Sequence, residues 1–190
     1  MGKKLFSNII ISIFLFILMP AFMPVKAQLV AGTSAEINYT KSKIIASDKG
    51  QDMFLKRRAI KNYLLKRGAP LATETDAFIQ ACTAYDLDCY LLPAISGVES
   101  SFGLYTSPGS NNPFGWGRGL IPFTSFSQSI ITVGKGLREN YINKGATTVP
   151  EIGRIYCEGD TWSGKVLYFM NQLENEEKNL LLLSANTVEL

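Results

Sequence analysis

The sequence predicts a mainly helical domain with one small irregular lobe that lines a cleft. Helices are predicted because apolar residues recur at intervals of three and four in several segments, as in Leu91, Ile95 and Val98. The lobe is predicted because residues 103–127 are rich in Gly, Pro and Asn, which forbid long helices. Aromatic residues are interleaved in this segment, namely Tyr105, Phe114, Trp116, Phe123 and Phe126.

The first 27 residues have the features of a secretory signal peptide. Lys3 and Lys4 give a positive start, the run from Leu5 to Phe22 is almost entirely apolar, and Val25-Lys26-Ala27 suits a cleavage site. The apolar run is also nearly long enough to remain in the chain as a membrane anchor. On both interpretations we expect the domain to lie outside the cytoplasm, either secreted or held in the cell envelope.

The rest of the chain divides into a polar linker over residues 28–47, a domain over 48–174 and a tail over 175–190. The first predicted helix covers residues 51–66 and ends before Gly68 and Pro70. Its apolar set is Phe54, Leu55, Ile60, Leu64 and Leu65. A second helix is predicted over residues 73–85, and a third carries Glu99 and has Pro93 in its first turn.

Three further helices are predicted after the lobe. The first covers residues 125–142 and is ended by Gly145, and the second is a short helix over residues 151–155. The third covers residues 162–173 and is amphipathic. The tail that follows is polar and then rich in leucine, and we expect it to pack loosely.

Charge and composition exclude several functions. Three of the 19 basic residues, Lys3, Lys4 and Lys26, lie in the leader, which leaves 16 against 16 acidic residues, so the mature chain is formally neutral. This balance argues against a general nucleic-acid binder. The chain has no histidine, which excludes a Ser-His-Asp triad, a Cys-His nucleophile and histidine-based zinc sites. We predict neither a metal nor a cofactor, and a monomer.

The chain has three cysteines, at positions 82, 89 and 157. In an exported protein a disulfide is expected. Cys82 lies in an apolar helical pattern, where a buried thiol is stable, so we expect the pair to be Cys89–Cys157. The alternative is Cys82–Cys89.

Glu99 is the leading candidate for catalysis. It lies beside the apolar stripe of its predicted helix, and an apolar surrounding raises the pKa of a carboxyl, as a general acid requires. No other Asp or Glu follows until Glu139, which we expect to face solvent. If the reaction uses a second carboxylate, Glu158 and Asp160 are the attractive candidates.

Three motifs in order resemble those of the bacterial endo-β-N-acetylglucosaminidases of the lysozyme superfamily. They are Gly97-Val98-Glu99-Ser100-Ser101-Phe102-Gly103, then Asn111-Asn112-Pro113-Phe114-Gly115, then the segment from Tyr156 through Trp162 to Val166. The resemblance covers roughly residues 70–173. It implies an α+β lysozyme-like fold and hydrolysis of the β-1,4 bond after N-acetylglucosamine in peptidoglycan, so glycan strands are the expected partner.

The resemblance also assigns roles to residues. Glu99 would be the proton donor, and Tyr156 would lie across the cleft near the reacting sugar. If a base is needed, the position of Asp160 in the loop between Tyr156 and Trp162 makes it the protein candidate. The candidates for glycan binding are Asn111, Asn112, Phe114, Trp116 and Trp162. A substrate-assisted reaction, in which the N-acetyl group of the sugar replaces the second carboxylate, needs Glu99 alone.

Three other functions remain open from the sequence. A lytic transglycosylase or muramidase would use the same glutamate helix and cut after N-acetylmuramic acid. A non-catalytic glycan-binding module would keep the aromatic residues and would not need Glu99. An extracellular scaffold would dock a partner through Leu180–Leu183, the only apolar run in the tail.

Overall fold

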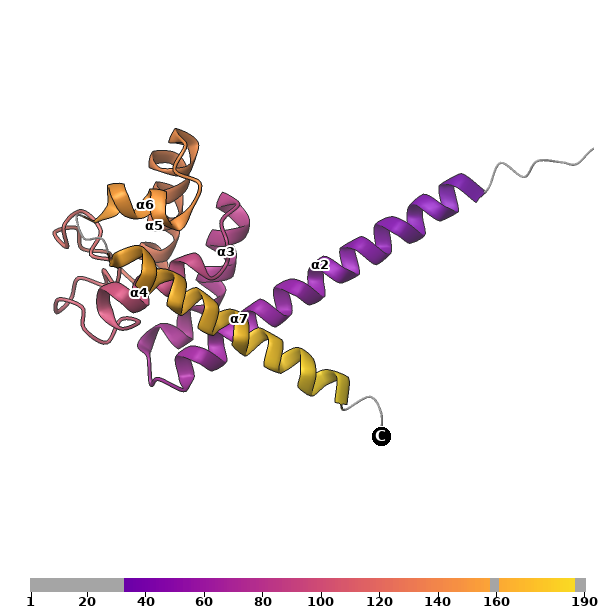
Figure 1. The fold of residues 1–190 in the computed structure, drawn as a ribbon, viewed down its shortest axis with the longest axis horizontal. Helices are drawn as coiled ribbons and strands as arrows, with labels where there is room; N and C mark the ends of the chain where they lie inside the picture. Colours follow the sequence, from indigo (N-terminus) through magenta and orange to yellow (C-terminus); the bar gives the residue numbers. More distant parts are fainter. Residues whose placement is uncertain (1–32, 158–160, 187–190) are drawn as a thin grey trace, which may run out of the picture. The chain divides into compact units, whose positions relative to one another are not determined.

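The computed structural model describes residues 33–157 and 161–186, and these residues are mainly helical. The helices along the chain are α2 (Thr33–Leu65), η1 (Pro70–Glu74), α3 (Thr75–Tyr85), α4 (Leu91–Ser100), α5 (Phe126–Asn140), η2 (Ile142–Lys144), α6 (Val149–Tyr156) and α7 (Trp162–Asn186) (Figure 1). The chain forms two compact units, residues 1–42 and 43–190. In the first unit the described residues, 33–42, are helical, and apart from this start of α2 everything below concerns the second unit.

The predicted mainly helical fold is confirmed, but no strand occurs in the described ranges, so the α+β character is not supported. Residues 102–125, between α4 and α5, consist of turns and bends. No helix within the described part of the chain has the length and apolarity needed to cross a membrane. The predicted signal peptide, residues 1–27, lies outside the described residues.

Helix α2 ends where the sequence predicts and begins earlier. Residues 33–47, predicted to be a linker, are helical because no Gly or Pro interrupts residues 33–49. The end follows the predicted signals, since Gly68 adopts a positive φ of 59° and Pro70 starts η1. Of the predicted apolar set, Leu55, Ile60 and Leu64 are buried, whereas Phe54 and Leu65 are exposed.

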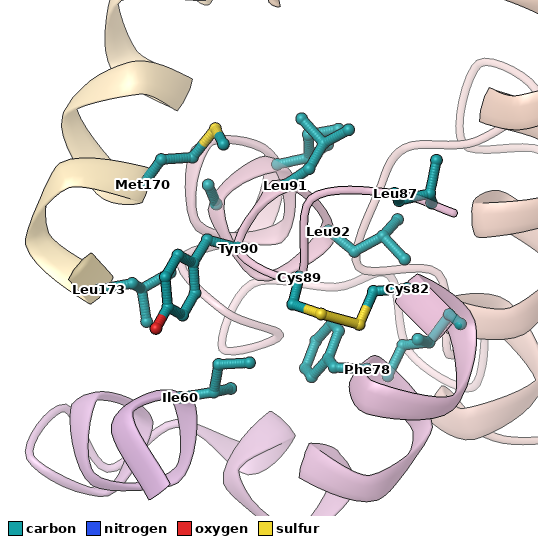
Figure 2. Packing of buried hydrophobic residues seen from close by; sticks show 14 of the residues in the cluster. Ile60, Phe78, Cys82, Leu87, Cys89, Tyr90, Leu91, Leu92, Met170 and Leu173 are labelled. Atoms are coloured by element: carbon teal, nitrogen blue, oxygen red, sulfur yellow. A yellow bond between two sulfur atoms is a disulfide. The ribbon is translucent and has the colours of Figure 1, made fainter. Parts of the chain in front are cut away.

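Helix α4 is the buried centre of the fold. Every residue from Leu91 to Gly97 is buried, and the helix packs against α7. Ser101 and Phe102 adopt left-handed backbone conformations and return the chain toward the core. The Phe102 ring then lies edge-on to Tyr63 and Phe169, with ring centroids 5.7 and 5.1 Å away. Figure 2 shows part of this core, including Leu91 and Leu92 from α4 and Met170 and Leu173 from α7.

The disulfide joins Cys82 to Cys89, so the predicted Cys89–Cys157 pair is wrong and the alternative is correct. Helix α3 ends at Tyr85, and the next residue, Asp86, adopts a left-handed conformation that reverses the chain. This reversal brings Cys89 back to the last turn of α3, with 4.9 Å between the two Cα atoms (Figure 2). Cys157 follows α6 and is exposed.

Residues 175–186 continue α7, so the prediction of a loosely packed tail from residue 175 is wrong for this part. Leu180 is buried in the core. Glu176 pairs with Lys66 at 2.7 Å, and Glu177 accepts a hydrogen bond from the Tyr90 hydroxyl at 2.7 Å. These contacts with distant residues extend the helix beyond the predicted end at residue 173.

Candidate active site

A pocket of about 290 Å³ lies where the end of α4 meets the lobe and the end of α6. Its walls come from four segments that are far apart in the sequence. The lining residues are Glu99, Phe114, Gly115, Trp116, Gly117, Arg118, Tyr141, Tyr156 and Cys157. Glu99 is the single carboxylate among the described residues of this lining. Glu139, the next acidic residue in the sequence, is exposed and paired with Lys135 on α5.

The carboxyl of Glu99 is held by one strong hydrogen bond. The indole nitrogen of Trp162 donates to Oε1 at 2.6 Å. The other oxygen, Oε2, lies so near the Gly115 backbone that a Cβ added to Gly115 would be 3.4 Å from it. A left-handed glycine at position 115, with φ of 59°, therefore allows the lobe to approach the acid closely.

Glu99 combines an open position with a raised pKa. Counted over all its atoms the residue is exposed, but its carboxyl lies at the pocket wall among aromatic rings. Burial of the carboxyl raises its pKa, and the Trp162 hydrogen bond opposes this shift because it favours the charged form. The net shift is upward, so Glu99 retains its proton to a higher pH than an ordinary glutamate.

An aromatic cluster surrounds the acid. Tyr156 stacks on Trp162 with centroids 4.9 Å apart and planes at 26°. Trp116 and Tyr141 lie 6.1 and 6.2 Å from Tyr156. Trp116 is seated against Gly136 of α5, where a Cβ would lie 2.5 Å from the indole ring. Glycine at position 136 is therefore required for Trp116 to reach this wall.

Tyr156 is fixed and neutral. Its hydroxyl donates to the carbonyl of Phe114 at 2.6 Å, which ties α6 to the lobe. Burial raises the pKa of Tyr156 well above its usual value, and the nearby charge of Glu99 raises it further. The phenol therefore keeps its proton to a higher pH than an ordinary tyrosine does.

The two asparagines hold the lobe together. Asn112 is buried, its amide nitrogen donates to the carbonyls of Trp116 and Ile121, and its amide oxygen accepts from the Trp116 backbone. Asn111 donates to the carbonyl of Phe123 at 3.0 Å. Both side chains therefore close turns of the lobe. For these two predicted glycan-binding residues, the structure shows hydrogen bonds to backbone atoms of the lobe.

The structure brings five of the predicted site residues together: Glu99, Phe114, Trp116, Tyr156 and Trp162. Trp162 is buried and acts on the pocket through its bond to Glu99. Phe114 lines the pocket although its side chain is fully buried. Asp160 and Glu158 lie outside the described residues.

Sequence reasoning missed Arg118 and Tyr141. Tyr141 immediately follows α5 and lines the pocket. Arg118 lies between two glycines of the lobe, and a charged residue in a glycine-rich loop is the signal that could have identified it.

A scan against protein-family models and a search of curated proteins found no match to this chain. No group of three or more His, Cys, Asp and Glu residues able to hold a metal ion occurs in the described ranges. What the pocket offers is a carboxyl of raised pKa that faces an open, aromatic-walled space. Such a group can donate a proton to an oxygen bound beside it.

Proposed function

We propose that this protein is a secreted hydrolase of cell-wall glycans, with Glu99 as the general acid. The observation that carries the proposal is the carboxyl of Glu99, which has a raised pKa and lies in an open pocket walled by Trp116, Tyr141 and Tyr156. A glycosidase needs a proton donor at the leaving oxygen, and sugar rings bind well against aromatic faces. The order of the three sequence motifs points to the bond after N-acetylglucosamine.

The mechanism we propose uses one protein carboxyl. Glu99 protonates the oxygen of the departing sugar while the N-acetyl oxygen of the retained sugar attacks the anomeric carbon. Water then opens the resulting ring, and Glu99 takes the proton that the water releases. This substrate-assisted scheme fits the single carboxylate among the described residues of the lining.

The aromatic residues position the acid and the substrate in this scheme. Trp162 fixes the Glu99 carboxyl by its hydrogen bond, and Tyr156 holds the Trp162 ring by stacking. Tyr156 borders the space where positive charge develops at the anomeric carbon, and its phenol oxygen can stabilise that charge. Trp116 offers the ring face on which a sugar would stack.

The single carboxylate also favours a second enzyme, a lytic transglycosylase. Such an enzyme would use Glu99 in the same way, but a hydroxyl of the muramic sugar would attack the anomeric carbon and leave an anhydro product. A glycan-binding module is the non-enzymatic alternative, and it has no need of a carboxyl with raised pKa.

Digestion of purified peptidoglycan by the protein and by its Glu99→Gln variant tests these proposals, with mass spectrometry of the reduced products. We expect fragments that end in reduced N-acetylglucosamine, and a loss of at least about a hundredfold in the variant. Anhydromuramic ends would assign the transglycosylase. Retained turnover in Glu99→Gln would remove Glu99 from the mechanism, and wall binding without products from either form would indicate the binding module.

A further inference from the structure

Arg118 lines the pocket and is its only cationic side chain among the described residues. The guanidinium makes no hydrogen bond or ion pair with any other described residue. The pKa of Glu99 is shifted by burial and by Trp162, so Arg118 does not neutralise the acid. An exposed arginine whose guanidinium has no partner among the described residues therefore borders the pocket where substrate is proposed to bind.

The turn that carries Arg118 is built to hold it in place. Gly117, Arg118 and Gly119 have φ values of 63°, 59° and 74°, all in the left-handed region. Backbone bonds from Gly119 to Gly115 at 2.8 Å and from Leu120 to Gly117 at 3.2 Å close the turn. The amide nitrogen of buried Asn112 donates to the carbonyls of Trp116, before this turn, and Ile121, after it.

The backbone conformation at position 118 favours glycine, as at 117 and 119. An arginine is strained there, because its Cβ approaches the following carbonyl. Residues kept in such conformations cluster at functional sites, where the side chain serves binding. The chain thus keeps an arginine at the pocket where glycine would be easier to accommodate.

We infer that Arg118 binds a carboxylate carried by the glycan, so the preferred substrate is an acidic glycan and not a neutral one. This inference rests on the proposed glycan-binding function of the pocket. The planar guanidinium matches a carboxylate with two parallel hydrogen bonds, which lysine cannot reproduce. In peptidoglycan the carboxylate comes from the lactyl group of muramic acid or from the peptide stem.

Three ligands of matched length separate these sources. A chito-oligosaccharide has no carboxylate, glycan strands stripped of their stems carry lactyl carboxylates, and strands with intact stems carry stem carboxylates only. Binding is measured by calorimetry in the Glu99→Gln background, so that no ligand is cut. The variants compared there are Arg118→Gln, Arg118→Lys and Arg118→Gly.

We expect Arg118→Gln to weaken binding of a carboxylate-bearing strand at least about tenfold, and to change binding of the neutral ligand less than twofold. Arg118→Lys should recover part of the loss. If Arg118→Gln loses affinity for the stripped strands, the lactyl carboxylate is the group that Arg118 binds. If it loses affinity only for strands with intact stems, the group is a stem carboxylate. Arg118→Gly should bind like Arg118→Gln and melt at or above the parent temperature, because glycine suits the backbone there.

Two controls separate this inference from the proposed function. Arg58→Gln removes an exposed arginine of α2 that stacks over Phe54 away from the pocket, and it should change nothing. Hydrolysis is assayed separately in protein that retains Glu99. If the protein cleaves no glycan but its binding still depends on Arg118, the hydrolase proposal is rejected and the role of Arg118 is kept. Equal losses on all three ligands, no loss on any, or no binding at all would overturn the inference.

Discussion

Burial and the hydrogen bond from Trp162 act in opposite directions on the pKa of Glu99. Burial raises the pKa of Glu99, and this bond keeps the pKa from rising further. A general acid works while it is protonated, so activity should fall as the pH rises through the raised pKa of Glu99.

Trp162→Phe removes the donor and keeps an aromatic ring against Tyr156. Because nothing then lowers the pKa of Glu99, we expect the alkaline limb of the kcat/KM profile to move to higher pH. A pH series from about 4 to 9 on soluble glycan strands measures this. An unchanged limb, with kcat/KM reduced equally at every pH, would show that Trp162 acts only by packing.

The same pKa shift predicts that the acid lowers the stability of the fold. The folded pKa of Glu99 is raised, so its favourable contribution is present below the unfolded pKa and is lost as the pH rises through the folded pKa. Glu99→Gln removes the buried charge and keeps an acceptor for Trp162. We therefore expect the variant to melt above the parent at pH 7 and close to the parent at pH 4.

Thermal unfolding at the two pH values checks this result. Glu139→Gln is the matched control, because Glu139 is an exposed glutamate on α5 and should change little at either pH. A Glu99→Gln variant that is less stable than the parent at pH 7 would mean that the charged carboxyl is well solvated.

At the scale of an element, α4 depends on a glycine at its centre. A Cβ at Gly97 would lie 2.5 Å from the Phe102 ring and 3.1 Å from Phe169. Gly97→Ala must therefore displace the ring that closes the core after α4. We expect a loss of about 1–3 kcal/mol in the free energy of unfolding, measured by denaturant titration.

Gly164→Ala is the control, since Gly164 lies in α7 with no atom within 4 Å of an added Cβ. There alanine should stabilise the helix by about 0.5–1 kcal/mol. A neutral Gly97→Ala variant would mean that Phe102 has another place to pack.

Local signals in the sequence were sufficient to predict several elements. Gly68 and Pro70 end α2, and Thr148 with Glu151 forms a capping box that starts α6. The start of α2 was missed because residues 33–47 have no apolar periodicity, and the disulfide because it depends on the left-handed turn at Asp86. Spacing along the chain does not reveal such a turn.

The pocket shows the same division between local and distant causes. The raised pKa of Glu99 was predicted because its apolar neighbours lie on its own helix. The bond from Trp162 joins residues 63 positions apart, and the amide of Asn112 is consumed by carbonyls of its own lobe. Both facts depend on how the chain closes around the lobe, and no local pattern encodes them.

At the scale of the molecule, α7 holds α4 at both ends. Trp162, the first residue of α7, bonds to Glu99 near the end of α4. Glu177, four turns later, accepts from Tyr90, which immediately precedes α4. The segment of α7 beyond residue 173 therefore belongs to the structure that positions the acid.

The bond between Glu177 and Tyr90 gives a test of this arrangement. Tyr90 is buried, and burial raises its pKa, so its hydroxyl stays protonated and needs an acceptor. Glu177→Ala leaves that hydroxyl unsatisfied and also removes the carboxylate that lies 3.5 Å from Lys56, and we expect a loss of about 1–3 kcal/mol in the free energy of unfolding. Glu177→Gln keeps an acceptor and should lose less.

Glu174→Ala, one turn earlier on α7, breaks only an exposed pair with Lys178 and should cost less than about 1 kcal/mol. If Glu177→Ala proves as mild as Glu174→Ala, then the bond to Tyr90 is not needed to hold α7 in place.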